Sequence, residues 1–214
     1  MASIANRRSV MVLYSDSTSP GGHCVRMVLA EKGINVEITY VKDGEEPEAL
    51  IEINPYNSVL TLVDRDLVLY DGQIIMEYLD ERFPHPPLLP VDPVMRAGNR
   101  QLRFRVLKDL YSLIEDIESS DSTKVGNAQK TMKDNLTAIA PAFTHKLYFM
   151  SDECTLVDCC MAPLLWRLPI YGVKLPASVR PITEYADRLF ERDSFQASLS
   201  EAEKEMRGCQ YLTE

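Results

Sequence analysis

Phe83-Pro84-His85-Pro86-Pro87-Leu88-Leu89-Pro90 is the stretch that decides the fold, because the chain changes character on either side of it. Proline fixes φ and biases the residue before it toward extended geometry, so the helical pattern ending at Arg82 cannot continue. We expect a stiff, largely polyproline-like loop, which loses little entropy on docking and so favours protein recognition. Its hydrogen-bonding group would be His85, and its apolar contacts would be Pro84, Pro86, Pro87 and Leu88. A plain interdomain linker is the alternative.

Before the proline stretch, strand and helix patterns alternate. Short apolar or alternating runs predict strands at 10–14, 35–41, 61–63 and 67–70, the last two forming a hairpin. Helical patterns cover 25–32, 46–53 and 72–83, and a loop rich in Ser, Pro and Gly separates the first strand from the first helix. The order βαβαββα predicts a small mixed sheet covered by helices.

After Pro90 the strand signals disappear. We expect helices at 93–118, 123–139, 155–168, 180–192 and 195–206. Thr155 is a helix N-cap candidate with Asp158 three residues on, which is a capping signal rather than a catalytic one. Pro163 and Pro169 should kink or end that helix. The fold class is therefore α/β plus all-α, with a first domain at 9–84, a proline-rich connector and recognition loop at 85–92, and a helical domain at 93–207.

Composition bounds the function. The 214-residue chain has a net charge of −9, so we expect no direct grip on nucleic acid, and its N-terminal apolar run is too short for a signal peptide or membrane span. A cytoplasmic protein is expected. Its cysteines, Cys24, Cys154, Cys159, Cys160 and Cys209, lack paired CxxC spacing and are interpreted as reduced, structural thiols. Its scattered histidines, His23, His85 and His145, do not argue for a metal site, and no cofactor is expected.

Four dispersed strings carry a family resemblance: Val25–Gly33, Ile75–Leu88, Ala162–Pro169 and Phe190–Phe195. Together with the domain order they resemble the stringent starvation protein A family, bacterial regulators associated with RNA polymerase. The resemblance implies a glutathione transferase-like fold, in which a thioredoxin-like domain precedes an all-helical domain. It also implies a homodimer that binds the sigma-containing polymerase holoenzyme, with the Pro84–Pro86 loop among the contacts to sigma.

Working glutathione transferases carry a Tyr, Ser or Cys after the first strand, a cis-proline before the third strand and a Glu/Asp-Ser pair before the third helix. This chain has Ser19 at the first place, with Tyr14, Ser15, Ser17 and Thr18 as nearby alternatives. It has Val59-Leu60 at the second, where a non-prolyl cis bond would cost roughly 2.5–4 kcal/mol, and Asp71-Gly72 at the third. Ser19 and Asp71 are typical of turns and helix caps. We therefore expect a vestigial glutathione site at Ser19, Val59, Leu60, Asp71 and Gly72, without catalysis.

Alternatives remain open from the sequence. A divergent glutathione transferase or peroxidase would use Ser19 or Cys24, and a chaperone-like binder would not depend on His85. Three arginines, Arg96, Arg100 and Arg103, have helical spacing and could form an anion site at a dimer cleft, although a solvated or dimer-facing set is the plainer interpretation.

Overall fold

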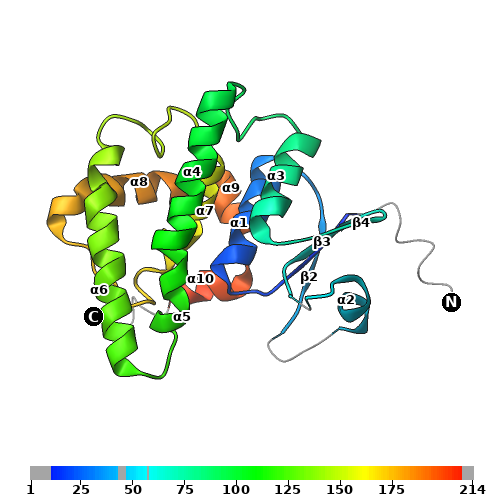
Figure 1. Ribbon diagram of the computed structural model, residues 1–214, viewed down its shortest axis with the longest axis horizontal. Helices are drawn as coiled ribbons and strands as arrows, with labels where there is room; N and C mark the ends of the chain where they lie inside the picture. The colour runs from blue at the N-terminus through cyan, green and yellow to red at the C-terminus, as the bar shows by residue number, and fades with distance from the viewer. Residues whose placement is uncertain (1–10, 43–46, 57, 209–214) are drawn as a thin grey trace. The chain divides into compact units, whose positions relative to one another are not determined.

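The computed structural model describes residues 11–42, 47–56 and 58–208 (Figure 1). The chain forms two compact units, which are described separately. The first contains the residues up to Pro86 together with Ala197–Glu205, and the second contains Pro87–Gln196 and the residues from Met206 onward. The helical domain expected from the sequence included 197–205, whereas this segment belongs to the sheet-containing unit.

The first unit is built on a four-stranded mixed sheet. Its strands are β1 (Val12–Ser15), β2 (Glu37–Tyr40), β3 (Thr61–Asp64) and β4 (Leu67–Tyr70), in the order β2-β1-β3-β4. β1 pairs in parallel with β2 and antiparallel with β3, so Leu13 lies between Ile38 and Leu62. β3 and β4 form the expected hairpin. The predicted βαβαββα order and thioredoxin-like arrangement are confirmed, although Val10, expected in β1, lies outside the described residues.

Three helices accompany this sheet: α1 (Pro20–Glu31), α2 (Glu48–Ile53) and α3 (Gly72–Arg82). α1 and α3 pack against one another and contribute core side chains such as Met27, Ile75 and Leu79, each 0% exposed. The predicted start of α1 at Val25 is wrong, because the helix already begins at Pro20. Ser19 caps it and Pro20 occupies its first turn, where a missing N–H removes no helical bond. Glu46, expected in α2, lies outside the described residues.

The second unit is helical. It contains α4 (Pro93–Asp109), α5 (Ile114–Ile117), α6 (Ser122–Ile139), α7 (Leu156–Arg167) and α8 (Arg180–Phe190), followed by most of α9 (Asp193–Ser198). Every residue of α7 is buried, and α4 and α8 pack on it. Among the described residues, none of the helices combines the length and hydropathy that a membrane crossing would need.

The capping box predicted for α7 is confirmed. Thr155 accepts a hydrogen bond from the helix, and the Asp158 carboxylate accepts bonds from the Thr155 N–H and hydroxyl, at 2.8 and 2.9 Å. The same carboxylate accepts bonds from the Tyr185 hydroxyl at 2.6 Å and the Phe149 N–H at 2.9 Å. Burial raises the pKa of Asp158, and the four hydrogen bonds oppose that shift.

Two more of the predicted helices differ from those in the structure. The helix expected at 93–118 ends at Asp109, because Leu110 is 2% exposed and leaves helical geometry with φ −123°. α7, by contrast, agrees with the predicted 155–168 to within one residue at each end, since it continues through Pro163 and ends before Pro169. The helix expected at 195–206 divides into α9 and α10 (Glu201–Gly208), because Ser200 and Glu203 cap each other's backbone N–H groups at 3.1 and 2.9 Å.

Candidate functional site

The segment Pro84–Pro86 follows the C-cap of α3, Phe83, and is exposed. The N–H of Phe83 still bonds to the Leu79 carbonyl at 3.0 Å, so the chain leaves the helix only at the first proline. The segment then runs through bends and contains a cis peptide bond between His85 and Pro86. It presents two prolines with an exposed imidazole between them.

A buried lysine anchors this loop. The ammonium group of Lys32, at the end of α1, donates to the Asp80 carboxylate at 2.5 Å and to the carbonyl oxygen of Pro86. Lys32 is 8% and Asp80 7% exposed, so the pair is held away from water. A buried charge of this kind is stable only with its partners in place, and it therefore fixes the end of the loop to the core of the unit.

The structure separates Leu88 from the exposed prolines. Pro87 is exposed, but Leu88 is 2% exposed and its carbonyl accepts a 2.9 Å hydrogen bond from the Leu156 N–H within the second unit. The prediction that Leu88 offers an apolar surface to a partner is therefore wrong, because the helical unit buries it. The chain bends repeatedly between Pro84 and Pro90 and does not form the expected extended polyproline-like loop. The buried side chains of Leu88 and Leu89 accompany this change of direction.

Ser19 acts as a helix cap. Its hydroxyl accepts a bond from the Gly22 N–H at 3.1 Å, and its own N–H donates to the Asp16 carboxylate, which also accepts from the Thr18 N–H at 2.9 Å. Burial opposes ionisation of Asp16, but the hydrogen bonds from Ser19 and Thr18 and the charge of Arg26 outweigh it, so the pKa of Asp16 is lowered. Ser19 and Asp16 thus stabilise the start of α1 and the loop before it through these hydrogen bonds.

A buried polar cluster lies beside the loop that joins β1 to α1. Arg26 of α1 makes a two-pronged ion pair with Glu203 of α10, with both hydrogen bonds at 2.7 Å, and donates to the Ser15 hydroxyl at 2.8 Å. His23 bonds to the Ser198 hydroxyl at 2.9 Å and lies 3.6 Å from the Glu203 carboxylate. Arg26 and Glu203 are 2% and 0% exposed. The cluster joins residues 197–205 to the loop after β1.

Neither the Lys32–Asp80 pair nor the Arg26–Glu203 pair was predicted from the sequence. Asp80 falls four residues after Met76 on the buried stripe of α3, and a carboxylate at an apolar position is a usable signal. Ser200 and Glu203 form an S-x-x-E capping box that the sequence displays. The partners Lys32 and Arg26, by contrast, carry no local signal of burial.

The structure places Leu60 and Gly72, two residues of the expected vestigial glutathione site, in contact near the start of α1. A Cβ placed on Gly72 would lie 3.3 Å from the Leu60 side chain, 3.8 Å from the Gly21 carbonyl and 3.9 Å from Val25. The Leu60 side chain therefore packs closely beside position 72, where a serine Cβ would require it to shift slightly. Within the described residues the single cis peptide bond is the one at Pro86, so Val59-Leu60 is trans.

Asp71 caps the start of α3 with its side chain. Its carboxylate accepts bonds from the Gln73 and Ile74 N–H groups at 2.8 and 3.2 Å, as the N-cap interpretation expected. Its φ of +88° places a non-glycine residue in the left-handed region at this strand-to-helix turn.

The three α4 arginines differ in their surroundings. Arg96 is partly buried and donates to the Pro90 carbonyl at 2.9 Å, Arg100 is exposed, and Arg103 is 3% exposed. Of the three, Arg100 is thus the one that is exposed. Among the described thiols, Cys24, Cys154, Cys159 and Cys160 are buried and unbridged, whereas Cys209 lies outside the described residues. Among the residues that the structure covers, no His, Cys, Asp and Glu side chains gather in a metal-holding group.

Comparison with known proteins agrees with this architecture. The family models described as "Glutathione S-transferase, N-terminal domain" and "Glutathione S-transferase, C-terminal domain" match residues 13–87 and 103–193. Among solved structures, the chain superposes on a Tau class glutathione S-transferase from mango with a TM-score of 0.81 at 21% identity, covering 96% of this chain and 100% of that one. A likeness at this identity shows the fold.

Curated relatives narrow the family. A stringent starvation protein A homolog from Coxiella burnetii is 49% identical over 94% of this chain and 97% of its own length. A homolog of the same name from Pasteurella multocida is 50% identical, covering 93% and 94%. Glutathione S-transferase Z1 from Arabidopsis thaliana is 36% identical over 71% of this chain and 74% of its own. The chain therefore belongs to the stringent starvation protein A family, which is built on the glutathione S-transferase fold.

Proposed function

We propose that this protein is an RNA polymerase-associated regulator of the bacterial starvation and stress response, and that Pro84–His85–Pro86 binds the sigma-containing holoenzyme. The observation that carries the proposal is how this loop is held: its three residues are exposed, while the buried Lys32 ammonium, paired with the buried Asp80 carboxylate, donates to the Pro86 carbonyl. A loop that is already held in one conformation loses little conformational entropy on docking. Little of the free energy gained from its contacts is then offset by ordering the loop. Such a regulator acts in the cytoplasm.

The same proposal holds that glutathione chemistry has been lost. Glutathione transferases use a free hydroxyl or thiol near the start of α1, whereas the Ser19 hydroxyl here accepts a helix-capping bond. The Leu60 side chain packs closely against Gly72, and the Asp71 carboxylate caps α3. Loss of one hydrogen bond to a charged carboxylate costs about 1.5–3 kcal/mol, or roughly one to two orders of magnitude in affinity. These positions support a binding role in place of catalysis.

A homodimer is part of the proposal. α4 exposes several large apolar side chains, namely Val94 (79%), Met95 (63%) and Phe104 (57%). Large apolar side chains this exposed on one helix favour an interface along that helix. Sedimentation of the full chain at micromolar concentration tests this: a dimer that Phe104→Asp converts to a folded monomer supports the α4 face, and an unchanged dimer contradicts it.

The decisive experiment compares polymerase binding by the wild type and by the Pro84→Ala/His85→Ala/Pro86→Ala variant, using purified sigma-saturated polymerase. His145→Ala is the matched control, because His145 is also an exposed loop histidine. The proposal expects the triple variant to lose binding and the control to keep it, with both variants folded. A wild type that does not bind, or that binds unrelated proteins equally well without depending on His85, contradicts it.

The alternative function is a divergent glutathione transferase or peroxidase that uses Ser19. Its support is the identity to glutathione S-transferase Z1 and the position of Ser19 at the N-terminus of α1. Retention on immobilised glutathione, with turnover that Ser19→Ala abolishes, would establish this alternative. The regulator proposal expects neither result.

A further inference from the structure

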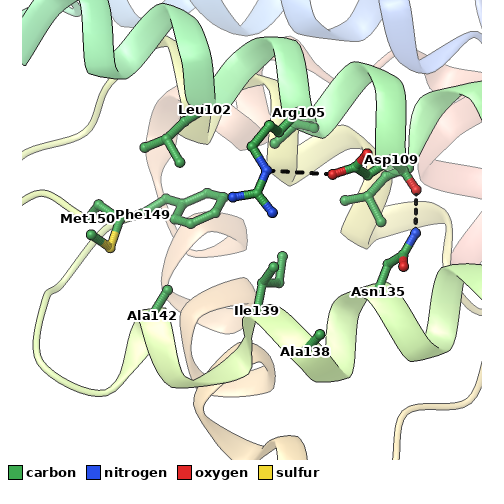
Figure 2. A pocket seen from close by; sticks show the side chains of 11 residues that line it. Leu102, Arg105, Asp109, Asn135, Ala138, Ile139, Ala142, Phe149 and Met150 are labelled. Carbon is green, nitrogen blue, oxygen red and sulfur yellow. Dashed lines mark hydrogen bonds and ion pairs between the residues drawn. The ribbon is translucent and has the colours of Figure 1, made fainter.

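The second unit contains a small pocket between α4 and α6. Its volume is about 290 Å³, at the lower end of the roughly 300–1,000 Å³ typical of ligand sites, so its occupant must be a small molecule. Figure 2 shows the pocket, with Leu102, Arg105 and Asp109 from α4 facing Asn135 and Ile139 from α6. None of the residues considered above for glutathione or polymerase lines it.

The interior of the pocket is apolar. Its walls consist largely of aliphatic and aromatic side chains, chiefly Leu102, Val106, Leu110, Ile139, Phe149 and Met150. Phe149 is fixed in position, since its N–H donates to the buried Asp158 carboxylate at 2.9 Å and its ring packs against Phe143 at an interplanar angle of 41°, with centroids 4.7 Å apart. The apolar wall is therefore preformed and suits an apolar side chain of a ligand.

Met150 closes one side in an unusual conformation. It lies in a tight turn in which Tyr148 and Ser151 exchange backbone hydrogen bonds at 3.0 and 3.4 Å, and its φ is +58°. Left-handed geometry at a residue other than glycine is sparsely populated and tends to occur at ligand sites. Met150 is 60% exposed where it lines the pocket, so a bound molecule would remove part of its apolar surface from water.

One cation and one anion stand at the mouth. Arg105 Nε and Asp109 Oδ2 are 3.6 Å apart, with side chains 61% and 45% exposed. An exposed helical pair of this kind is worth only about 0.3–0.5 kcal/mol, so a ligand can readily replace it. Within the described part of the chain, the terminal guanidinium nitrogens of Arg105 donate no hydrogen bond, and Figure 2 shows them directed over the pocket.

The anion stands where a helix ends. Asp109 is the last residue of α4, and its carbonyl accepts a 2.7 Å bond from the Asn135 side chain. A carboxylate at a helix C-terminus is disfavoured by the helix dipole, whereas an ammonium group is favoured there. The mouth thus offers a place for a positive group beside Asp109 and for a negative group beside Arg105.

We propose that this pocket binds a free α-amino acid with an apolar side chain. Arg105 receives its carboxylate, Asp109 receives its ammonium group, and Leu102, Phe149 and Met150 enclose its side chain. A zwitterion matches a mouth that carries one charge of each sign, whereas a simple anion would meet the Asp109 carboxylate and a simple cation would meet Arg105. This inference is independent of polymerase binding.

The test is an NMR titration of the ¹⁵N-labelled full chain with L-phenylalanine, 3-phenylpropionate and 2-phenylethylamine, three probes that share the apolar body. We expect L-phenylalanine to bind with a dissociation constant of about 1 mM, and each probe lacking one charge to bind roughly tenfold more weakly. The shifted amides should lie in 102–110 and 147–151. No saturable shift with L-phenylalanine, or equal binding of 3-phenylpropionate, would overturn the proposal.

Variants locate the site. Arg105→Gln and Asp109→Asn should each weaken L-phenylalanine binding roughly tenfold, and Ala138→Phe should abolish it by filling the pocket. Arg180→Gln is the matched control, because Arg180 forms an exposed i,i+4 pair with Glu184 away from the pocket. All four substitutions change partly or fully exposed side chains, and thermal melts check that the variants fold. Undiminished binding by both mouth variants would contradict the assignment.

Discussion

Replacing Lys32 with methionine removes the cation shared by the Asp80 carboxylate and the Pro86 carbonyl. The side chains of Lys32 and Asp80 are 0% and 8% exposed, so the remaining carboxylate would be buried without its partner. Breaking such a pair costs about 3–5 kcal/mol, which is a large part of the roughly 5–15 kcal/mol that stabilises a typical domain. With a urea dependence near 2 kcal/mol per molar, the unfolding midpoint should fall by roughly 2 M.

A second variant separates stability from loop position. Lys32→Met/Asp80→Leu replaces the ion pair with apolar side chains, which is often neutral or stabilising. Urea unfolding should therefore return close to the wild-type midpoint. The Pro86 carbonyl still lacks its donor, however, so affinity for sigma-saturated polymerase should remain up to about tenfold weaker. Lys174→Met, at an exposed lysine, is the control for loss of charge.

Two results would refute this reasoning. A midpoint shift in Lys32→Met equivalent to less than about 1 kcal/mol would mean that the buried pair contributes little. Wild-type polymerase affinity in the double variant would mean that the anchor does not position the loop.

Other substitutions test the remaining contacts. Ser19→Ala should cost about 1 kcal/mol in urea unfolding through loss of the α1 cap while polymerase binding is unchanged, and loss of binding would contradict a purely capping role. Asp158→Asn should destabilise the helical unit by about 3 kcal/mol, because an amide cannot accept the four hydrogen bonds made to this carboxylate; a calorimetric shift below about 1 kcal/mol would argue against that network. The lowered pKa of Asp16 predicts stability that is present above its ordinary value of 3.8 and is lost as pH falls through the folded-state pKa. Asp16→Asn should therefore flatten the acid limb of the stability profile below about pH 4, and an unchanged limb would contradict the assignment.

Local patterns in the sequence were sufficient for the fold. The alternating and helical runs before Phe83 gave the order of the sheet unit, and the Thr155/Asp158 pair located the start of α7, because both signals depend on neighbours within a few residues. The break at Leu110 was not predictable in this way, since no proline or glycine marks it and the burial of one leucine accompanies it. Local propensity yields to tertiary packing at such places.

The buried ion pairs lay beyond sequence reasoning for a different reason. Lys32 and Asp80 are 48 residues apart, and Arg26 and Glu203 are 177 apart, so no window of the sequence contains both partners. Leu88 was misjudged because its neighbours are exposed prolines, whereas its burial depends on the helical unit. The exposed part of the loop, Pro84–Pro86, could be located from the sequence, but the residues that hold it could not.

The ion pair between Arg26 and Glu203 has a consequence for the synthesis and dissection of this chain. Because α10 supplies the carboxylate that neutralises a buried arginine of α1, the sheet unit cannot complete its interior until nearly the whole polypeptide has left the ribosome. A fragment that stops at Pro86 would retain every strand and still leave Arg26 without its counter-charge. The two halves of the gene are therefore not interchangeable modules, and a graft of the first half alone would need a new partner for Arg26.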